Sequence, residues 1–131
     1  MTRDEIIAYW VATAEQDYQT MMHLYYSKDY HWCLFMGHLV LEKLLKAVYV
    51  ARKGIDVPRS HDLLRLSEKA GLNTNDEQKD RMDLITSFNI AARYPDYKQS
   101  FYKKCTKMFA DEALIAIKEL RMWFLTILEL K

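Results

Sequence analysis

Along most of this chain, apolar residues recur every three to four positions, which is the period of an α-helix. Glycine and proline are scarce, with three and two copies, so tight hairpins are hard to build. The first apolar run joins Ile6, Trp10, Ala14, Met21 and Tyr25. Thr2 before it is a suitable N-cap, and the polar stretch "SKD" at 27–29 predicts a turn. We therefore expect a first helix between them.

The next segment, from about residue 30 to 52, is apolar on nearly every side. Trp32, Phe35, Leu39, Leu44 and Val48 are spread around its circumference rather than along one stripe. A helix with that pattern is buried by its neighbours, so this segment is predicted to be the central helix.

The remaining pattern predicts three further helices and an all-α fold. Ser60 is a suitable cap for a short helix over 61–70, and Gly71 suits the left-handed position that ends it. The stretch "NTND" opens a fourth helix that ends near Ala92, and a fifth runs from about Met108 to the terminus. We expect residues 1–131 to form one domain, an up-and-down bundle of about five helices.

Composition narrows the functional classes. A net charge of +1 with half of the 131 residues hydrophobic indicates a soluble domain without a broad basic surface. The N-terminus lacks the layout of a secretion signal, and the apolar runs are too short for a membrane span, so a cytoplasmic location is expected. Cys33 and Cys105 have no paired spacing and are expected to be free thiols. The usual catalytic motifs and metal-ligand spacings are missing, so no cofactor or metal is predicted.

Three polar residues interrupt the predicted central helix. His38, Glu42 and Lys46 stand four apart and form one stripe between apolar faces. An intrahelical ladder of pairs is the favoured interpretation, and an acid–base set is the alternative. All three are secondary candidates for a site.

Three more polar residues are secondary candidates. His61 and Asp62 stand where a helix is expected to begin, where a carboxylate caps the helix and complements its dipole. A ligand-binding role for this pair is the alternative. Asp17 lies in an otherwise apolar helical face, where a buried carboxylate needs a cation, so a structural ion pair is expected.

Four stretches of the chain are distinctive as an ordered set: "WVATAEQDYQTM", "CLFMGHLVLEKLLKAVYV", "SHDLLRL" and "FNIAARYPDY". Together they resemble the HEPN domain family of small prokaryotic helical proteins. They follow one another in the family's order. The resemblance implies a bundle of about five helices, homodimerisation and, in many members, genomic pairing with a minimal nucleotidyltransferase as a toxin–antitoxin system. Members with ribonuclease activity have an Arg followed four to six residues later by His, which cleaves RNA without metal at the dimer interface.

Arg93 stands where such an arginine is expected, but residues 97–99 are Tyr, Lys and Gln, and no histidine follows anywhere in the chain. Metal-free cleavage needs a group that titrates near neutral pH, and ordinary lysine and tyrosine side chains do not. We therefore predict no catalytic residues and favour a binding protein. The alternative is a divergent ribonuclease toxin that uses Arg93 with Lys98 or Tyr97.

The segment after Arg93 is still rich in candidate ligand-binding groups. Because Pro95 disfavours helix at Tyr94, the fourth helix is expected to end near Arg93 and to be followed by a loop. Basic groups among aromatic rings suit phosphates and bases, so the candidates are Arg93, Tyr94, Asp96, Tyr97, Lys98, Lys103 and Lys104. In the competing interpretation, Arg93 pairs with Asp17 or the helix end and the aromatic rings pack the end of the bundle. The expected ligands are nucleotide or RNA phosphates, or a nucleotidyltransferase partner.

Overall fold

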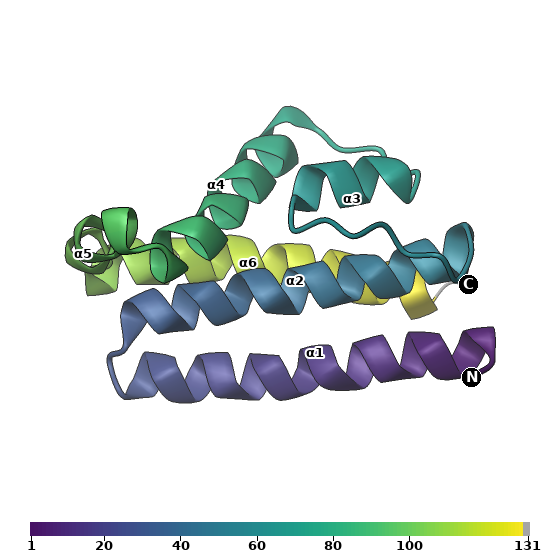
Figure 1. Ribbon diagram of the computed structural model, residues 1–131, viewed down its shortest axis with the longest axis horizontal. Helices are drawn as coiled ribbons and strands as arrows, with labels where there is room; N and C mark the ends of the chain where they lie inside the picture. The colour runs from purple at the N-terminus through teal and green to yellow at the C-terminus, as the bar shows by residue number, and fades with distance from the viewer. Residues whose placement is uncertain (130–131) are drawn as a thin grey trace.

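The computed structural model describes residues 1–129, which form six helices and no strands. The helices are α1 (Arg3–Tyr26), α2 (Tyr30–Arg52), α3 (Leu63–Lys69), α4 (Asp76–Arg93), α5 (Pro95–Lys104) and α6 (Lys107–Glu129), shown in Figure 1. The predicted all-helical bundle is confirmed. The additional helix is α5, which occupies the segment predicted as a loop.

Local sequence explains where α1 and α4 begin. Thr2 and Glu5 form a reciprocal capping box at the start of α1, and Asn75 and Gln78 form another at the start of α4. These contacts satisfy backbone N–H groups that have no partner within the helix. The predicted caps Thr2 and "NTND" are thus confirmed.

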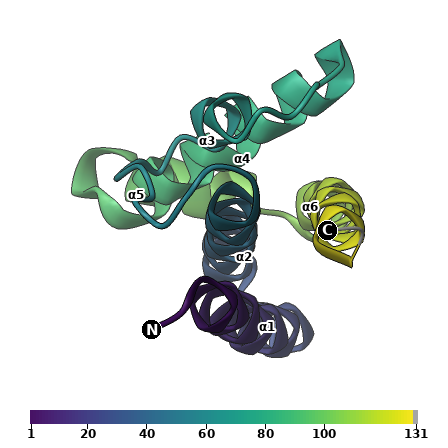
Figure 2. The same cartoon turned by 90° about the vertical axis from the view of Figure 1, so that its right-hand side faces the viewer.

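α2 lies at the centre of the bundle. It runs back along α1, while α6 lies beside it and α3 and α4 cover another side, as the two views in Figures 1 and 2 show. Its buried residues lie all around the helix, because neighbours contact it from several directions. The prediction that 30–52 is the central helix is confirmed, including both of its bounds.

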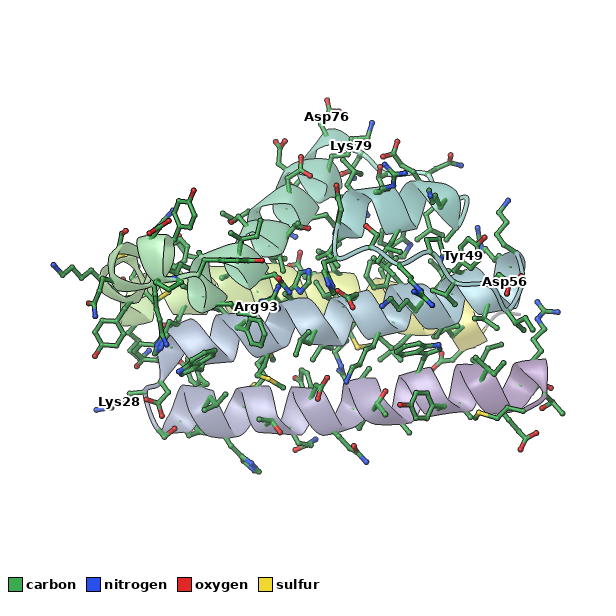
Figure 3. All side chains as sticks on the ribbon, in the orientation of Figure 1. Lys28, Tyr49, Asp56, Asp76, Lys79 and Arg93 are labelled. Carbon is green, nitrogen blue, oxygen red and sulfur yellow. The ribbon has the colours of Figure 1, made fainter. Side chains whose placement is uncertain are left out.

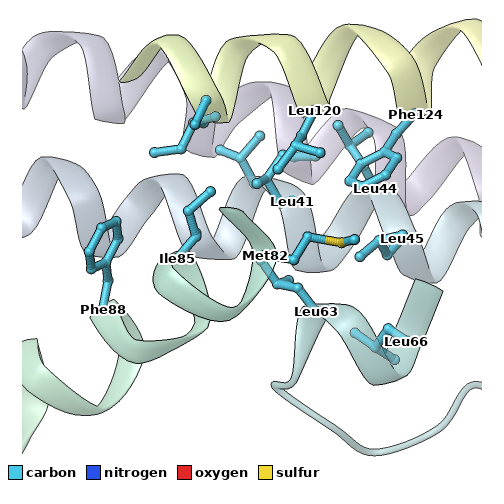
Figure 4. Packing of buried hydrophobic residues seen from close by; sticks show 14 of the residues in the cluster. Leu41, Leu44, Leu45, Leu63, Leu66, Met82, Ile85, Phe88, Leu120 and Phe124 are labelled. Carbon is cyan, nitrogen blue, oxygen red and sulfur yellow. The ribbon is translucent and has the colours of Figure 1, made fainter. Parts of the chain in front are cut away.

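The core is made of aliphatic and aromatic side chains that interlock between α2, α3, α4 and α6 (Figure 4). Fully buried members include Leu41, Leu45, Leu63, Met82, Ile85, Phe88 and Phe124. At Gly37 the Ile117 side chain from α6 packs against the backbone of α2, and an added Cβ would lie only 2.4 Å from Ile117 Cδ1. The Ile117 side chain therefore occupies the space that a larger residue at position 37 would need.

Two local predictions are corrected. The N-cap of α3 is Asp62 and not Ser60, because the Asp62 carboxylate accepts a hydrogen bond from the Arg65 N–H. Ser60 instead accepts from the Asp62 N–H within the preceding turn. Gly71 has a φ of +80°, as predicted for the residue after this helix.

The second correction concerns the segment after Arg93. α4 ends at Arg93 as expected, but the chain turns at Tyr94 and starts α5 directly at Pro95. Proline is well suited to the first position of a helix, where its missing N–H has no partner to lose. The same residue therefore ends one helix and begins the next.

No helix in residues 1–129 is both long enough and apolar enough to cross a membrane.

Candidate functional site

A row of hydrogen bonds links the end of α4 to the centre of α2. Arg93 donates through Nη2 to Asn89 Oδ1 at 2.7 Å, and through Nε to the Asn89 carbonyl at 3.3 Å. Asn89 Nδ2 lies 3.3 Å from His38 Nδ1, and His38 Nε2 lies 2.7 Å from the carbonyl oxygen of His61. Figure 3 shows Arg93 where α4 comes down onto α2. The row joins α4, α2 and the loop before α3.

The direction of every bond in this row follows from its two ends. A carbonyl only accepts, so His38 Nε2 carries the proton, and Nδ1 is left to accept from the Asn89 amide. The Asn89 oxygen then faces the Arg93 guanidinium. His38 is fully buried, and burial lowers its pKa despite the hydrogen bond to His61 and the nearby Glu42 charge. The imidazole of His38 is therefore neutral and has one fixed tautomer.

Glu42 accepts a hydrogen bond from the ring of His61, whose backbone carbonyl is hydrogen-bonded to His38. Its Oε1 accepts from His61 Nδ1 at 2.7 Å, and its Oε2 accepts from Lys46 Nζ at 3.0 Å. Burial alone would raise the pKa of Glu42, but the hydrogen bonds from His61 and Lys46 and the Lys46 charge outweigh it and hold the pKa below its usual range. Glu42 is thus an ionised carboxylate that is only 5% exposed.

A cleft of about 420 Å³ opens between the loop before α3 and the second half of α4. Its lining residues are Ser60, His61, Asp62, Thr86, Asn89, Ile90, Arg93 and Tyr94. Thr86 Oγ1 accepts from the Leu63 N–H at 3.1 Å, which ties the start of α3 to α4 beneath the cleft. The volume lies within the range of small-ligand sites in proteins.

The cleft presents two kinds of available hydrogen-bonding group. Asn89 engages Nε and one N–H of Nη2 in the exposed Arg93 side chain, so both N–H groups of Nη1 have no partner among the described residues. The His61 side chain is 63% exposed, and Glu42 holds its Nδ1, which leaves Nε2 as its available ring nitrogen. Chemically, this arrangement offers guanidinium N–H donors and one imidazole nitrogen to an anion in the cleft.

The structure brings together several residues that the sequence left as separate candidates. His38, Glu42 and Lys46 do form the predicted ladder, with Lys46 at 3.0 Å and His38 at 3.9 Å from the Glu42 oxygens. His61 joins the same carboxylate from the loop. These four residues and Arg93 belong to one connected polar group.

Asn89 is the member of this group that the sequence analysis missed. It is 4% exposed and joins Arg93 to His38. The available signal was its position, one helical turn before Arg93 and next to Phe88 on the apolar face of α4. A polar residue on a buried face requires a partner, as it did for Asp17.

Asp17 lies outside the site. The Lys43 ammonium is 2.6 Å from Asp17 Oδ2, across the α1–α2 contact, so the expected structural ion pair is present. That oxygen has no well-oriented hydrogen bond, and the contact is therefore mainly a charge pair. Asp17 does not pair with Arg93, which corrects one of the two interpretations of Arg93. The other, in which Arg93 contacts the end of its own helix, is confirmed by its bond to the Asn89 carbonyl.

The candidate residues of segment 94–104 do not form one site, because they lie in different parts of the surface. Tyr94 lines the cleft with Arg93, and its ring lies 5.7 Å from the guanidinium carbon. Tyr97 and Lys104 line a second hollow between α4 and α5. Lys98 Nζ lies 5.1 Å from the ring centre of Trp32 on α2. Asp96 and Lys103 are exposed on α5 and line neither hollow.

Taken together, the fold and the site define an all-helical protein with a polar cleft between α4 and the loop before α3. The family model described as "HEPN domain" matches residues 7–128, which is most of the chain. This chain belongs to the HEPN domain family. Comparisons with curated proteins and with solved structures found no significant match.

Proposed function

We propose that the cleft beside Arg93 binds the phosphate groups of nucleotides or RNA. The observation that carries this proposal is the exposed Arg93 guanidinium, which Asn89 holds in place while both N–H groups of Nη1 have no partner within residues 1–129. A guanidinium with paired N–H donors fits two oxygens of one phosphate, and fixing it in advance lowers the entropy lost on binding.

The surroundings of Arg93 suit the rest of a nucleotide. Tyr94 is 51% exposed beside the guanidinium and offers a ring on which a base stacks. His61 adds a ring nitrogen on the opposite wall of the cleft, and the Lys103 side chain is exposed on the adjoining helix. A short single-stranded segment or a mononucleotide is the ligand class that this combination favours.

Assembly is part of the proposal. Many members of the family are paired with a minimal nucleotidyltransferase in a toxin–antitoxin system, which supports such a protein as the partner of this chain. We expect the chain itself to form a homodimer. Exposed apolar side chains on α4 and α5, among them Leu84, Ile90 and Tyr97, are suited to a contact with a second copy. Light scattering at tens of micromolar is expected to give the dimer mass, and a monomer mass would contradict homodimerisation.

The alternative function is a metal-independent ribonuclease that uses Arg93 without the usual histidine. One observation favours it: a histidine from another part of the chain, His61, lines the same cleft as Arg93.

Fluorescence polarisation with a labelled single-stranded RNA and with labelled ATP tests the binding proposal. Arg93→Ala is expected to weaken binding at least tenfold, because it removes a directed, charged contact. Arg65→Ala is the matched control, since Arg65 is exposed on α3 and does not line the cleft. Equal affinities for the wild type and Arg93→Ala, or no binding of either probe by the wild type, would overturn the proposal.

A further inference from the structure

We propose that His61 is the general base and acid of the cleft, that Glu42 positions it, and that the pair cleaves a phosphodiester whose neighbouring ribose carries a free hydroxyl. This inference rests on the proposed phosphate site, because Arg93 must hold the phosphate at which the reaction occurs. It assigns the proton-transfer role to residues that precede Arg93 by many positions in the chain.

The surroundings of His61 are those that a proton-transferring imidazole requires. An ionised carboxylate that is 5% exposed accepts from Nδ1 at 2.7 Å, which fixes the tautomer and leaves the lone pair on Nε2. The ring itself is 63% exposed and lines a cleft. A carboxylate behind the ring also stabilises the imidazolium that forms when Nε2 accepts a proton.

The other three histidines lack this combination. His38 is fully buried, and both of its ring nitrogens are engaged within the protein. His31 is packed between the rings of Trp32 and Tyr102. His23 is exposed on α1, but no carboxylate in the described part of the chain orients it. His61 alone has a buried carboxylate on one nitrogen and an open cleft at the other.

Both carboxylate oxygens of Glu42 accept hydrogen bonds, one from His61 and one from Lys46. Lys46 occupies its second oxygen at 3.0 Å, so the carboxylate cannot rotate freely away from His61. The backbone of His61 is fixed independently, because its carbonyl accepts from His38 Nε2 at 2.7 Å. Both ends of the Glu42–His61 pair are therefore anchored, which is what a positioned proton-transfer group needs.

The reaction assigned to His61 and Arg93 is an internal transfer at a phosphodiester of RNA. His61 Nε2 removes the proton of the ribose 2′-hydroxyl, and the 2′-oxygen forms a bond to phosphorus. The bond from phosphorus to the 5′-oxygen of the next nucleotide breaks, and the His61 imidazolium returns the same proton to that oxygen. Arg93 stabilises the negative charge on the phosphate oxygens meanwhile. The products are a 2′,3′-cyclic phosphate and a free 5′-hydroxyl, and no co-reactant is required.

The experiment uses the full chain with an end-labelled oligoribonucleotide that contains every dinucleotide step, in a buffer with EDTA. A second oligonucleotide of the same sequence, with deoxyribose throughout, measures binding without cleavage. Wild type is expected to produce fragments that end in 2′,3′-cyclic phosphate. His61→Ala is expected to slow cleavage by about 100-fold or more, a much larger loss than any loss of affinity for the deoxyribose strand.

Three further variants separate the roles. His23→Ala is the matched control and is expected to cleave like the wild type. Free imidazole in the buffer is expected to restore part of the activity of His61→Ala, which a purely structural role of His61 would not allow. Glu42→Gln is expected to lower the rate at saturating RNA with little change in binding, and its thermal midpoint shows whether the fold is retained.

Different outcomes overturn different proposals. Cleavage by His61→Ala at the wild-type rate, products that end in 3′-hydroxyl groups, or tight RNA binding without any cleavage would overturn the role of His61 and leave the phosphate site standing. Loss of binding to every strand and to ATP in the wild type would overturn the phosphate site itself, and the role of His61 with it.

Discussion

Asn89 connects Arg93 to His38, since its Oδ1 accepts from Arg93 Nη2 at 2.7 Å and its Nδ2 donates to His38 Nδ1 at 3.3 Å. One buried amide thus orients the guanidinium in the cleft and satisfies the buried imidazole. The position of Arg93 depends on the core of the bundle, and not only on the end of α4.

The first prediction follows from that connection. Asn89→Leu keeps a similar volume but leaves the buried His38 Nδ1 without a donor, so the free energy of unfolding should fall by about 1–3 kcal/mol. The affinity for RNA or ATP should fall as well, because the guanidinium loses its support. Urea unfolding and fluorescence polarisation measure the two effects. Ser87→Ala, on the exposed side of α4, should change neither quantity. Reduced stability with unchanged affinity would mean that Asn89 supports only the fold.

The second prediction concerns the pH dependence of stability. Burial lowers the pKa of His38 in the folded protein, so the unfolded chain takes up a proton at this residue first as the pH falls. Stability should therefore decrease as the pH drops below the ordinary histidine pKa of about 6.5, and the decrease should end below the lowered folded pKa. Urea unfolding at a series of pH values between about 8 and 5 measures this slope. His38→Gln, which cannot be protonated, should show a smaller slope, and an equal slope would contradict the assignment.

The third prediction tests the close approach of α2 and α6. Gly37→Ala places a methyl group 2.4 Å from the present position of Ile117 Cδ1, so the two helices or the Ile117 side chain must shift. Overpacking costs about 1–3 kcal/mol, and the better helix propensity of alanine returns about 1 kcal/mol. The net result should be a modest destabilisation.

The matching double variant isolates the cause. Ile117→Val removes Cδ1, so the combined variant Gly37→Ala/Ile117→Val should be more stable than the sum of the two single effects implies, by about 0.5–1 kcal/mol or more. Thermal unfolding of all four proteins gives this coupling. Simple additivity would show that contact with Ile117 does not set the requirement for glycine.

The fourth prediction separates directed from diffuse charge. Arg93→Lys keeps the charge but loses the forked donor pair and the bond to Asn89 Oδ1, so it should weaken phosphate binding more than its unchanged charge suggests. Single replacements of Lys98, Lys103 and Lys104 by alanine should weaken binding modestly and reduce its dependence on salt. Polarisation titrations at several salt concentrations, with thermal midpoints on the same variants, separate binding from folding. Lost stability with unchanged affinity in Arg93→Lys would show that Arg93 has a structural role only.

The sequence by itself determined the elements that depend on neighbours along the chain. Capping residues such as Thr2 and Asn75, the left-handed Gly71 and the all-round apolar pattern of residues 30–52 act within a few residues of where they stand. Their physical effects are local, so a pattern in one dimension is sufficient to predict them. The ladder of His38, Glu42 and Lys46 belongs to this class, because helical spacing alone places its members side by side.

Only the tertiary structure decided which of these polar groups form one site. Glu42 meets His61 across 19 residues of chain, and Asn89 meets His38 across 51, because the loop before α3 and the end of α4 both pack on the middle of α2. The direction of helix packing depends on how side chains from distant segments fit together, and no local pattern encodes it. The same packing placed Asp17 beside Lys43 and away from Arg93, which left the guanidinium available at the cleft.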